Sequence, residues 1–492
     1  MAKSLSVLFT ASEIYPFVKD VGMADVAHSL PLALKDLGND VRVMLPKYGN
    51  ISERKNRIHD INRLRDMSVP MNDDVFFATI KSSSIQNTRT KVQSYITTNS
   101  NFFDALKGVY SDPKTWEEYD NNDERFIFFC RSVVETCVLL NWFPDIIHAN
   151  DWQTALIPAL AKVLYPKQFS KTKFVLTIHN LEQQGEYPWS KVKLLGIPEN
   201  EESNFKFKNK LNFMKAGIKY ADYITAGSET FAKDLMNDKN ISGGLYTVFK
   251  SRKKDFKGIL SSLDKWMWNP EKDSLIKAKY ESDFDEYKYH NKVEVINQFG
   301  FEFQPKVPLI GFLSDFSSQS GMADLIDSLD SILKESVQIS ILGRKSGDIK
   351  LKAKLDKLVK SNPQKLKVIY GYDDTLVHQM KAGCDMFLFL NKYEPSGVSM
   401  MQASTYGSVP IVRVTGGIPE SIELYSKDNT NGFVIGINNQ KDSIFNAIKE
   451  AVNYYKDKEL WTEIARNGMY EEFGWDENAK AYDTIYRNLL KP

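Results

Sequence analysis

Residues 146–156, IIHANDWQTAL, pass from a short apolar run to a polar turn and then to a helical pattern. The run Ile146 to Ala149 reads as a buried strand, and a helix is expected to begin near Trp152. The same succession of apolar run, polar cluster and amphipathic stretch recurs along the chain. Alternating strands and helices, with strands that are almost continuously apolar, indicate an α/β fold with parallel sheets covered on both faces.

The predicted strands form two groups, which suggests two doubly wound domains. In the first half, strands are expected at Val7 to Ala11, Val41 to Leu45, Ile146 to Ala149 and Phe174 to Ile178, with a helix at Ala24 to Leu37 that ends at Gly38. In the second half, they are expected at Leu309 to Leu313, Ile339 to Leu342, Val368 to Tyr370, Met386 to Leu390 and Ile411 to Val414.

The region between these groups, from about Lys250 to Pro308, is rich in charged and aromatic residues and shows no clean strand. We place a hinge within it, near Lys257 to Asn269. A chain of 492 residues is too long for one ordinary core, which also favours two domains. No internal repeat or low-complexity segment interrupts the pattern.

Composition excludes several classes of protein. Hydrophobic residues make up 42% and charged residues 26%, as in globular proteins. The 64 basic and 63 acidic residues give a net charge of +1, which gives no reason to expect nucleic acid or an anionic membrane as a partner. No stretch resembles a signal peptide or a membrane span. The three scattered cysteines, Cys130, Cys137 and Cys384, suit a reducing compartment, so a cytoplasmic protein is expected.

Polar clusters follow the predicted strands, where ligands of such sheets bind. Five segments stand out: residues 19–26 (KDVGMADV), 148–156 (HANDWQTAL), 177–185 (TIHNLEQQG), 394–399 (EPSGVS) and 415–417 (TGG). Five polar clusters after strand ends are the arrangement expected of an active site between two domains.

In order along the chain, these segments resemble the bacterial glycogen synthase and plant starch synthase family. That family has a K-T-G-G-L loop, an H-x-x-D-W segment, an H-N-L-x-Y-Q-G segment, an E-P-C-G-L segment and a following T-G-G. The resemblance continues through residues 211–218, 258–264, 268–270 and 371–373 and ends in Phe473-Gly474-Trp475-Asp476, so it covers nearly the whole chain.

The resemblance implies the GT-B fold, with two facing Rossmann-like domains and a last helix that crosses back to the first. The expected boundaries are 1–256 for the acceptor-side domain, 257–469 for the donor-side domain and 470–492 for the crossing helix. It also implies transfer of glucose from ADP-glucose to the end of an α-1,4-glucan, with retention at the anomeric carbon, no metal and no cofactor besides the donor substrate. The oligomeric state stays open.

Residue roles follow from the same resemblance. His179, Asp151 and Glu394 would be catalytic: His179 beside the sugar, Asp151 and Glu394 on hydroxyl groups. Negative charge grows on the leaving diphosphate, and main-chain N–H groups at helix starts can hold it. The residues expected to bind the donor are Lys19, Gly22, Asp315, Arg344, Tyr372 (against adenine), Gly397, Val398, Ser399, Thr415 and Gly416.

Several of these residues have plainer interpretations. Asp151 could merely cap the helix near Trp152, and Glu394 could be an ordinary loop residue. Gly416-Gly417 could be only a tight turn, and Lys19 could be solvated. His148 is expected to be structural, and His28, His59, His290 and His378 to be surface or helix residues without a role.

The chain departs from the family at the donor phosphate. Where the family has an Arg and a Lys that clamp the diphosphate, this chain has Asp315 and Ser320. Val21 replaces the first glycine of the K-T-G-G loop, and Ser261-Ser262 replaces an Asn-Gly pair. Losing one well-placed donor costs on the order of a hundredfold to a thousandfold in rate.

Three hypotheses therefore remain. The chain could be an active glucosyltransferase in which the inserted pair Arg344 and Lys345 replaces the lost cations, although such a pair is often only a solvated loop. It could be a non-catalytic relative that binds glucan or regulates a partner enzyme, which Asp315 favours. It could also use another nucleotide or acceptor. We expect Asp315 to point toward the diphosphate.

Overall fold

The structure, a computed structural model, describes residues 3–20, 22–115, 117–344, 347–371, 373–422, 432–435 and 443–491. The chain divides into two compact units. Unit 1 comprises Met1–Asp264 together with Gly474–Pro492, and unit 2 comprises Lys265–Phe473.

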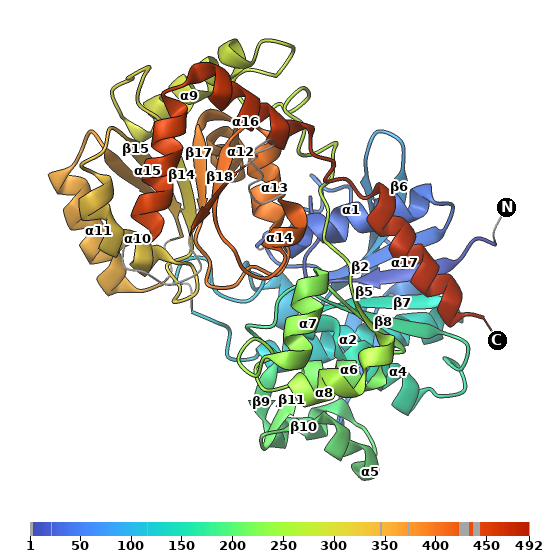
Figure 1. Cartoon of the computed structure of the whole chain (residues 1–492). Coiled ribbons are helices and arrows are strands. Elements are labelled where there is room, and N and C mark those ends of the chain that lie inside the picture. The colour runs from blue at the N-terminus through green and yellow to red at the C-terminus, as the bar shows by residue number, and fades with distance from the viewer. Residues whose placement is uncertain are drawn as a thin grey trace. The chain divides into compact units, whose positions relative to one another are not determined.

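Unit 1 is built on a ten-stranded sheet in the order β13-β12-β8-β7-β1-β2-β6-β5-β3, with β4 paired to β5 (Figure 1). All neighbouring strands from β13 to β6 in this order pair in parallel. Strand β5 pairs antiparallel with β6, and β3 and β4 both pair antiparallel with β5. The strands are β1 (Ser6–Thr10), β2 (Asp40–Pro46), β3 (His59–Asp60), β4 (Met67–Met71), β5 (Asp74–Gln86), β6 (Lys91–Thr98), β7 (Ile146–Asn150), β8 (Lys173–Ile178), β12 (Tyr223–Ala226) and β13 (Phe256–Gly258). A small antiparallel sheet contains β9 (Glu186–Pro188), β10 (Lys206–Phe207) and β11 (Lys210–Asn212).

Helices cover both faces of the parallel part of this sheet, which is why its central strands are apolar on both sides. On one face α2, α4 and α6 pack against one another, and on the other α1 packs against α17 (Figure 1). The helices of unit 1 are α1 (Met23–Asp36), α2 (Asn122–Leu140), α3 (Asp151–Thr154), α4 (Leu156–Leu164), α5 (Glu199–Glu202), α6 (Phe213–Tyr220), α7 (Glu229–Asn237), α8 (Tyr246–Ser251) and α17 (Asp476–Leu489).

The last helix belongs to unit 1, as the resemblance implied for a helix that crosses back. Just before α17, the Trp475 Nε1–H donates to Ser29 Oγ in α1 at 2.8 Å. Further along, Asn39 Nδ2 donates to Asp483 Oδ1 at 2.9 Å. These contacts fix the start and the middle of α17 to the first domain.

Unit 2 has a six-stranded parallel sheet in the order β16-β15-β14-β17-β18-β19. This is the order of a doubly wound dinucleotide-binding sheet. The strands are β14 (Leu309–Ser314), β15 (Gln338–Gly343), β16 (Leu366–Tyr370), β17 (Met386–Phe389), β18 (Val409–Arg413) and β19 (Phe433–Ile435).

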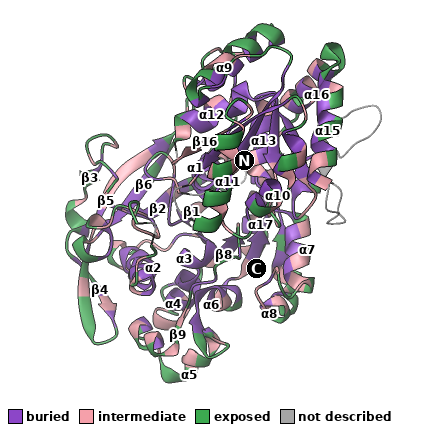
Figure 2. Cartoon of the chain, turned by 90° about the vertical axis from the view of Figure 1, so that its left-hand side faces the viewer, coloured by how far each residue is buried: buried purple, intermediate pink, exposed green. Residues whose placement is uncertain are grey.

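The helices of unit 2 lie on both faces of its sheet. Contacts join α10 to α11 and α15, and separately join α9 to α12 and α13 to α16. The helices are α9 (Phe284–Phe299), α10 (Met322–Ile332), α11 (Ile349–Ser361), α12 (Asp374–Gly383), α13 (Val398–Thr405), α14 (Ile418–Ser421), α15 (Ser443–Tyr455) and α16 (Lys458–Tyr470). Figure 2 shows buried strands beneath helices whose outer faces are exposed.

The nine predicted strands are confirmed to within two residues at each end. Strands β4 to β6 were not predicted from the sequence. In β5, polar and apolar residues are mixed and many are only half-buried, so the strand shows no continuous apolar run. The region thought to lack a clean strand contains the three-residue β13, which pairs with β12. Such a short strand has too little pattern to detect. In the described part of the chain, no helix combines the length and apolar character needed to cross a membrane.

Candidate active site

In unit 1 the chain order reverses between β1 and β7, because β1 continues to β2 on one side while β7 continues to β8 on the other. Ligands of doubly wound sheets bind beyond the carboxyl ends of the two strands at such a point. Glu13, Lys19 and Gly22 follow β1, and Asp151 follows β7. His179 follows the next strand, β8.

Asp151 has the left-handed backbone conformation, with a φ of 54°, which is uncommon for a residue with a side chain and concentrates at functional sites. Its Oδ1 accepts the main-chain N–H of His179 at 2.7 Å and that of Asn180 at 3.4 Å. Burial raises the pKa of this carboxyl to about 7. The helix-cap interpretation is wrong, because the side chain binds the end of β8 and caps no helix.

The His179 side chain is held by Asn150. His179 Nε2 lies 2.9 Å from Asn150 Oδ1, while Asn150 Nδ2 donates to the Thr10 carbonyl at 3.0 Å. Since that contact fixes the amide orientation and the amide oxygen only accepts, Nε2 carries the ring proton and Nδ1 keeps its lone pair. Burial lowers the pKa of His179 to about 4, so the ring is neutral at pH 7.

Lys19 is not a solvated surface residue. Its Nζ lies 3.0 Å from Asp25 Oδ2 in α1, and its side chain is 14% exposed. Gly22 immediately precedes α1 with an ordinary φ of −63°, and a Cβ there would meet nothing within 4 Å. The position therefore lets a ligand approach the start of α1 without requiring glycine for its backbone conformation. Val21 lies outside the described residues.

In unit 2 the chain order reverses between β14 and β17. Asp315 follows β14 directly, and Glu394 lies in the loop between β17 and α13. Glu394 Oε2 accepts from Asn391 Nδ2 at 2.9 Å, and Oε1 accepts the Gly397 N–H at 3.2 Å. Burial raises the pKa of Glu394. The loop therefore holds this carboxylate in one orientation, and its catalytic role stays a prediction.

The turn after β18 supports this loop. Gly416 has a φ of 53°, and a Cβ there would lie 2.1 Å from the Glu394 carbonyl oxygen. That oxygen accepts the Gly417 N–H at 3.0 Å, and the Thr415 carbonyl accepts the Ile418 N–H at 3.2 Å. The tight-turn interpretation is correct, and the turn also fixes the main chain of Glu394.

Gly397 has a φ of 75° and precedes α13. Val398 and Ser399 occupy the first turn of that helix, where N–H groups have no partner within the helix. Lys381 Nζ lies 3.2 Å from Ser399 Oγ and 3.3 Å from its carbonyl oxygen. These residues bring N–H dipoles and a nearby cation to one helix start.

Asp315 and Ser320, where the chain departs from the family pattern, lie in the segment after β14. Asp315 is exposed, and its Oδ1 accepts the N–H of Ser317 at 2.9 Å. Ser320 is 5% exposed, and its Oγ donates to the Ser317 carbonyl at 2.9 Å. Both side chains thus stabilise the turn after β14.

The proposed replacement cation, Arg344, directly follows β15. Its N–H donates to the Ser314 carbonyl at 2.9 Å, so the residue lies beside the end of β14. Its expected neighbour Lys345 and the adenine-packing candidate Tyr372 lie outside the described residues.

Two histidines expected at the surface or on helices do lie on helices but are buried. His28 Nδ1 lies 2.9 Å from the Tyr15 carbonyl oxygen. His378 stacks on Trp268 with ring centroids 3.9 Å apart and lies 2.6 Å from Asp273. His148 is buried in the core, as the sequence predicts. Asn150 and Asn391, which orient His179 and Glu394, went unidentified; only their closeness to the candidate motifs could have marked them.

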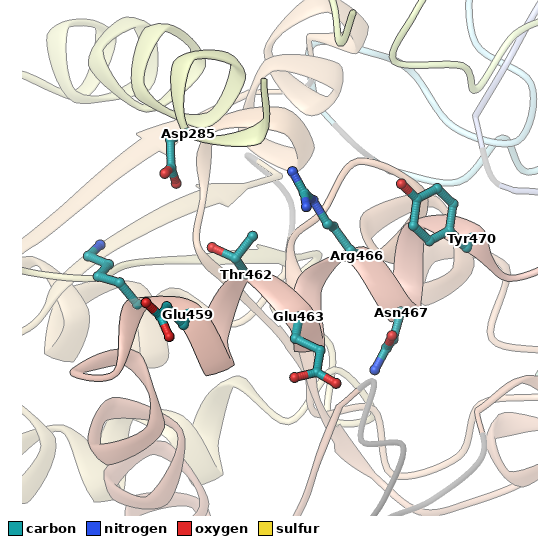
Figure 3. A pocket seen from close by; sticks show the side chains of 8 residues that line it. Asp285, Glu459, Thr462, Glu463, Arg466, Asn467 and Tyr470 are labelled. Atoms are coloured by element: carbon teal, nitrogen blue, oxygen red, sulfur yellow. The ribbon is translucent and has the colours of Figure 1, made fainter. Parts of the chain in front are cut away.

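A surface depression of about 570 Å³ lies elsewhere in unit 2. Figure 3 shows Asp285 of α9 and Thr462 and Arg466 of α16 at its wall. No predicted site residue lines it. Among the residues that the structure describes, no group of three or more His, Cys, Asp or Glu side chains is arranged to hold a metal ion.

Comparisons with known proteins match both units. The family model described as "Starch synthase catalytic domain" matches residues 6–251, and "Glycosyl transferases group 1" matches residues 296–468. The chain is 35% identical to glycogen synthase of Chlorobaculum parvum over 490 residues, with 99% of each chain covered. It is 34% identical to glycogen synthase of Elusimicrobium minutum over 501 residues, covering 99% of this chain and 100% of that one.

Solved structures show the same fold. The catalytic domain of Starch Synthase IV from Arabidopsis thaliana, bound to ADP and acarbose, superposes with a TM-score of 0.88 at 25% identity. It covers 99% of this chain and 100% of that one. Sucrose-phosphate synthase from Thermosynechococcus elongatus, at a TM-score of 0.59 and 14% identity over 98% of each chain, shares the fold. The architecture is therefore that of GT-B glycosyltransferases.

Proposed function

This chain belongs to the family of bacterial glycogen synthases and plant starch synthases, and we propose that it transfers glucose from ADP-glucose to the non-reducing end of an α-1,4-glucan. The family consists of glucosyltransferases, and transfer proceeds with retention at the anomeric carbon. No metal ion or further cofactor takes part in the proposed reaction, which takes place in the cytoplasm.

The observation that carries this proposal is the constrained pair Asp151 and His179 at the switch point of unit 1. Asp151 keeps a left-handed backbone and a buried carboxyl there, while Asn150 holds the ring of His179. Both features cost stability, since a strained backbone and a buried carboxylate are each unfavourable. A chain that needed only to fold would have no physical reason to keep both at one strand edge.

These side chains suit sugar recognition and transfer. Asp151 Oδ1 accepts from the main chain just after β8, which leaves Oδ2 to accept a hydroxyl of glucose or of the acceptor. His179 is neutral, so it approaches the electron-poor sugar centre without adding positive charge. Glu394, fixed by Gly397 and Asn391, accepts hydroxyls of the donor glucose.

The leaving diphosphate needs positive charge and N–H donors. The Gly397 N–H is engaged with Glu394, so Val398 and Ser399 at the start of α13 and Gly22 before α1 supply the N–H groups. Lys19 and Arg344 supply charge. Thr415 and Gly416 complete the donor side, and Tyr372 packs on adenine. We expect variants of these residues, in either unit, to impair the same reaction.

The direct test incubates the purified chain with ADP-glucose and glycogen and follows release of ADP. We expect ADP to form only when both substrates are present, and glycogen to gain labelled glucose in equal amount. UDP-glucose serves as the control donor. Absence of ADP release at high enzyme concentration, from a chain shown to be folded, would overturn the proposal.

One observation favours a second candidate, a non-catalytic relative that binds glucan. Asp315 presents an exposed carboxylate directly after β14, at the switch point of unit 2. An anion near a diphosphate repels it, by about 1 kcal/mol at 4 Å even in water. Weak ADP binding with retained glucan binding would support this candidate.

Asp315→Arg is expected to tighten ADP binding about tenfold, because it removes one repulsive charge and adds an attractive one. Position 315 accepts a long side chain since it is exposed, whereas Ser320 is buried, so the single variant is more informative than one that also carries Ser320→Lys. Calorimetric titration with ADP measures the change.

Asp315→Asn is the matched control. An amide oxygen still accepts the Ser317 N–H, so the turn is kept while the charge is lost. We expect an intermediate affinity. If Asp315→Arg binds ADP no better than the unaltered chain, Asp315 does not face the diphosphate.

A further inference from the structure

A buried polar cluster joins the last helix to the strands that carry the candidate catalytic residues. It consists of His148 on β7, Thr177 on β8, Thr225 on β12, and Tyr482 and Tyr486 on α17. All five side chains are at most 2% exposed. The segments are far apart in the sequence, since His148 and Tyr486 are separated by 338 positions.

Short hydrogen bonds run through the cluster. His148 Nδ1 lies 2.6 Å from the Tyr486 hydroxyl, and His148 Nε2 lies 2.5 Å from Thr177 Oγ1. Thr177 Oγ1 in turn lies 2.5 Å from Thr225 Oγ1. The ring of His148 therefore has both nitrogens engaged, one with α17 and one with β8.

This cluster lies one layer below the site. Side chains two residues apart on a strand point to the same face, so Asn150 stands next to His148 along β7. His179 likewise comes two residues after Thr177 in β8. Two side-chain hydrogen bonds therefore connect β7 with β8 and the residue after it: His148 with Thr177, and, at the strand ends, Asn150 with His179.

The two layers are also connected directly. The His148 carbonyl accepts Thr10 Oγ1 at 3.3 Å and lies 3.5 Å from Asn150 Nδ2. Burial, together with the nearby His179 ring, lowers the pKa of His148 to about 3. His148 is therefore neutral, and each ring nitrogen needs a partner of the matching kind.

We propose that Tyr486 is a positioning residue for the transfer reaction: its hydroxyl fixes the ring of His148, which sets the alignment of β7 with β8 and thereby the orientation of His179 against Asn150. The crossing helix would thus do more than tie the chain's end to unit 1. The catalytic part of this proposal rests on the proposed function, whereas the orientation of His179 does not.

Removal of the hydroxyl leaves a buried ring nitrogen of His148 without its partner, which is costly. The ring is expected to turn or change tautomer to recover a hydrogen bond, loosening its contact with Thr177. A small misalignment of a reacting group lowers the rate strongly. For Tyr486→Phe we expect kcat to fall on the order of tenfold, with KM for both substrates nearly unchanged.

The test combines kinetics with nitrogen NMR of histidine in the full-length chain, which contains six histidines. Loss of one signal pair in His179→Gln assigns the ring of His179. In the unaltered chain we expect one tautomer, with the proton on Nε2. In Tyr486→Phe the two ring nitrogens should move toward a common averaged shift.

Tyr287→Phe is the matched control, because it removes an equally buried hydroxyl, bonded to the Tyr406 carbonyl at 3.2 Å in unit 2. It should change neither the His179 signals nor kcat. If Tyr486→Phe does not fold, Thr177→Val breaks the next link with a side chain of the same shape, and the same NMR change is required.

A folded variant with unchanged His179 signals would overturn the positioning role, whether or not the enzyme is active. Altered His179 signals in a chain whose unaltered form transfers no glucose would leave the alignment supported and reject the proposed function alone.

Discussion

Asp151→Asn is expected to lower glucosyl transfer about a hundredfold and, above pH 7, to make the chain more stable. The loss arises because a hydroxyl bound by a carboxylate loses a charge-assisted hydrogen bond, which contributes roughly 1.5–3 kcal/mol. The gain arises because an amide keeps the contacts with the N–H groups of His179 and Asn180 but carries no buried charge. Asn also tolerates the left-handed backbone well.

The raised pKa of Asp151 determines how the free energy of unfolding changes with pH. The pKa of Asp151 is about 7 in the folded chain and 3.8 ordinarily, so between these values the unfolded chain loses the proton while the folded chain keeps it. The free energy of unfolding therefore falls as pH rises through this window and levels off above it. The ceiling of the effect is about 4 kcal/mol.

Chemical denaturation of both proteins from pH 4 to pH 8 measures this difference. We expect the two curves to meet near pH 4 and to separate as pH rises. Asp145→Asn is the control, because it makes the same change at the opposite end of β7, where the carboxylate accepts the Ser6 N–H at 2.8 Å. That variant should keep full transfer activity. A constant difference between Asp151→Asn and the unaltered chain across the pH range would contradict the prediction.

Glu394→Gln is expected to reduce transfer on the order of a hundredfold to a thousandfold. The carboxylate accepts from two donors, Gly397 N–H and Asn391 Nδ2. A glutamine can accept from only one of them and sets its own NH₂ group against the other. The variant thus loses both the charge that binds donor hydroxyls and the fixed orientation of the loop. Steady-state rates with ADP-glucose and glycogen measure the effect.

A second substitution separates these two causes. In Asn391→Asp combined with Glu394→Gln, the new carboxylate at position 391 accepts from the glutamine NH₂, while the glutamine oxygen accepts the Gly397 N–H. We expect thermal stability to recover and activity to stay low, because the negative charge now lies at the wrong position. Recovery of activity along with stability would show that Glu394 only shapes the loop.

Much of the fold was readable from the sequence because central strands of parallel sheets are buried on both faces and so become continuous apolar runs. Strands β1 and β14 carry this signal over most of their length. Strand β5 does not, since it pairs antiparallel near the sheet edge and has mixed burial. The candidate site was readable for a related reason: polar residues shortly after an apolar run, such as Asp151 and Glu394, mark strand ends.

The tertiary structure alone decided what these residues contact. From the sequence, Lys19 could be a solvated surface residue, but in the structure Asp25 of α1 lies 3.0 Å from its Nζ. From the sequence, Asp151 could be a helix cap, but the pairing of β7 with β8 places the His179 N–H at its carboxylate. Neither contact follows from local pattern, because each depends on how neighbouring segments pack.

The sequence by itself determined the fold class, the positions of the main strands and the residue types at their ends. It did so because burial and backbone conformation act on each segment locally. Only the tertiary structure decided that Asn150 orients His179 and that Tyr486 reaches His148. Such contacts join residues far apart in the chain, and strand order, which no single segment encodes, brings them together.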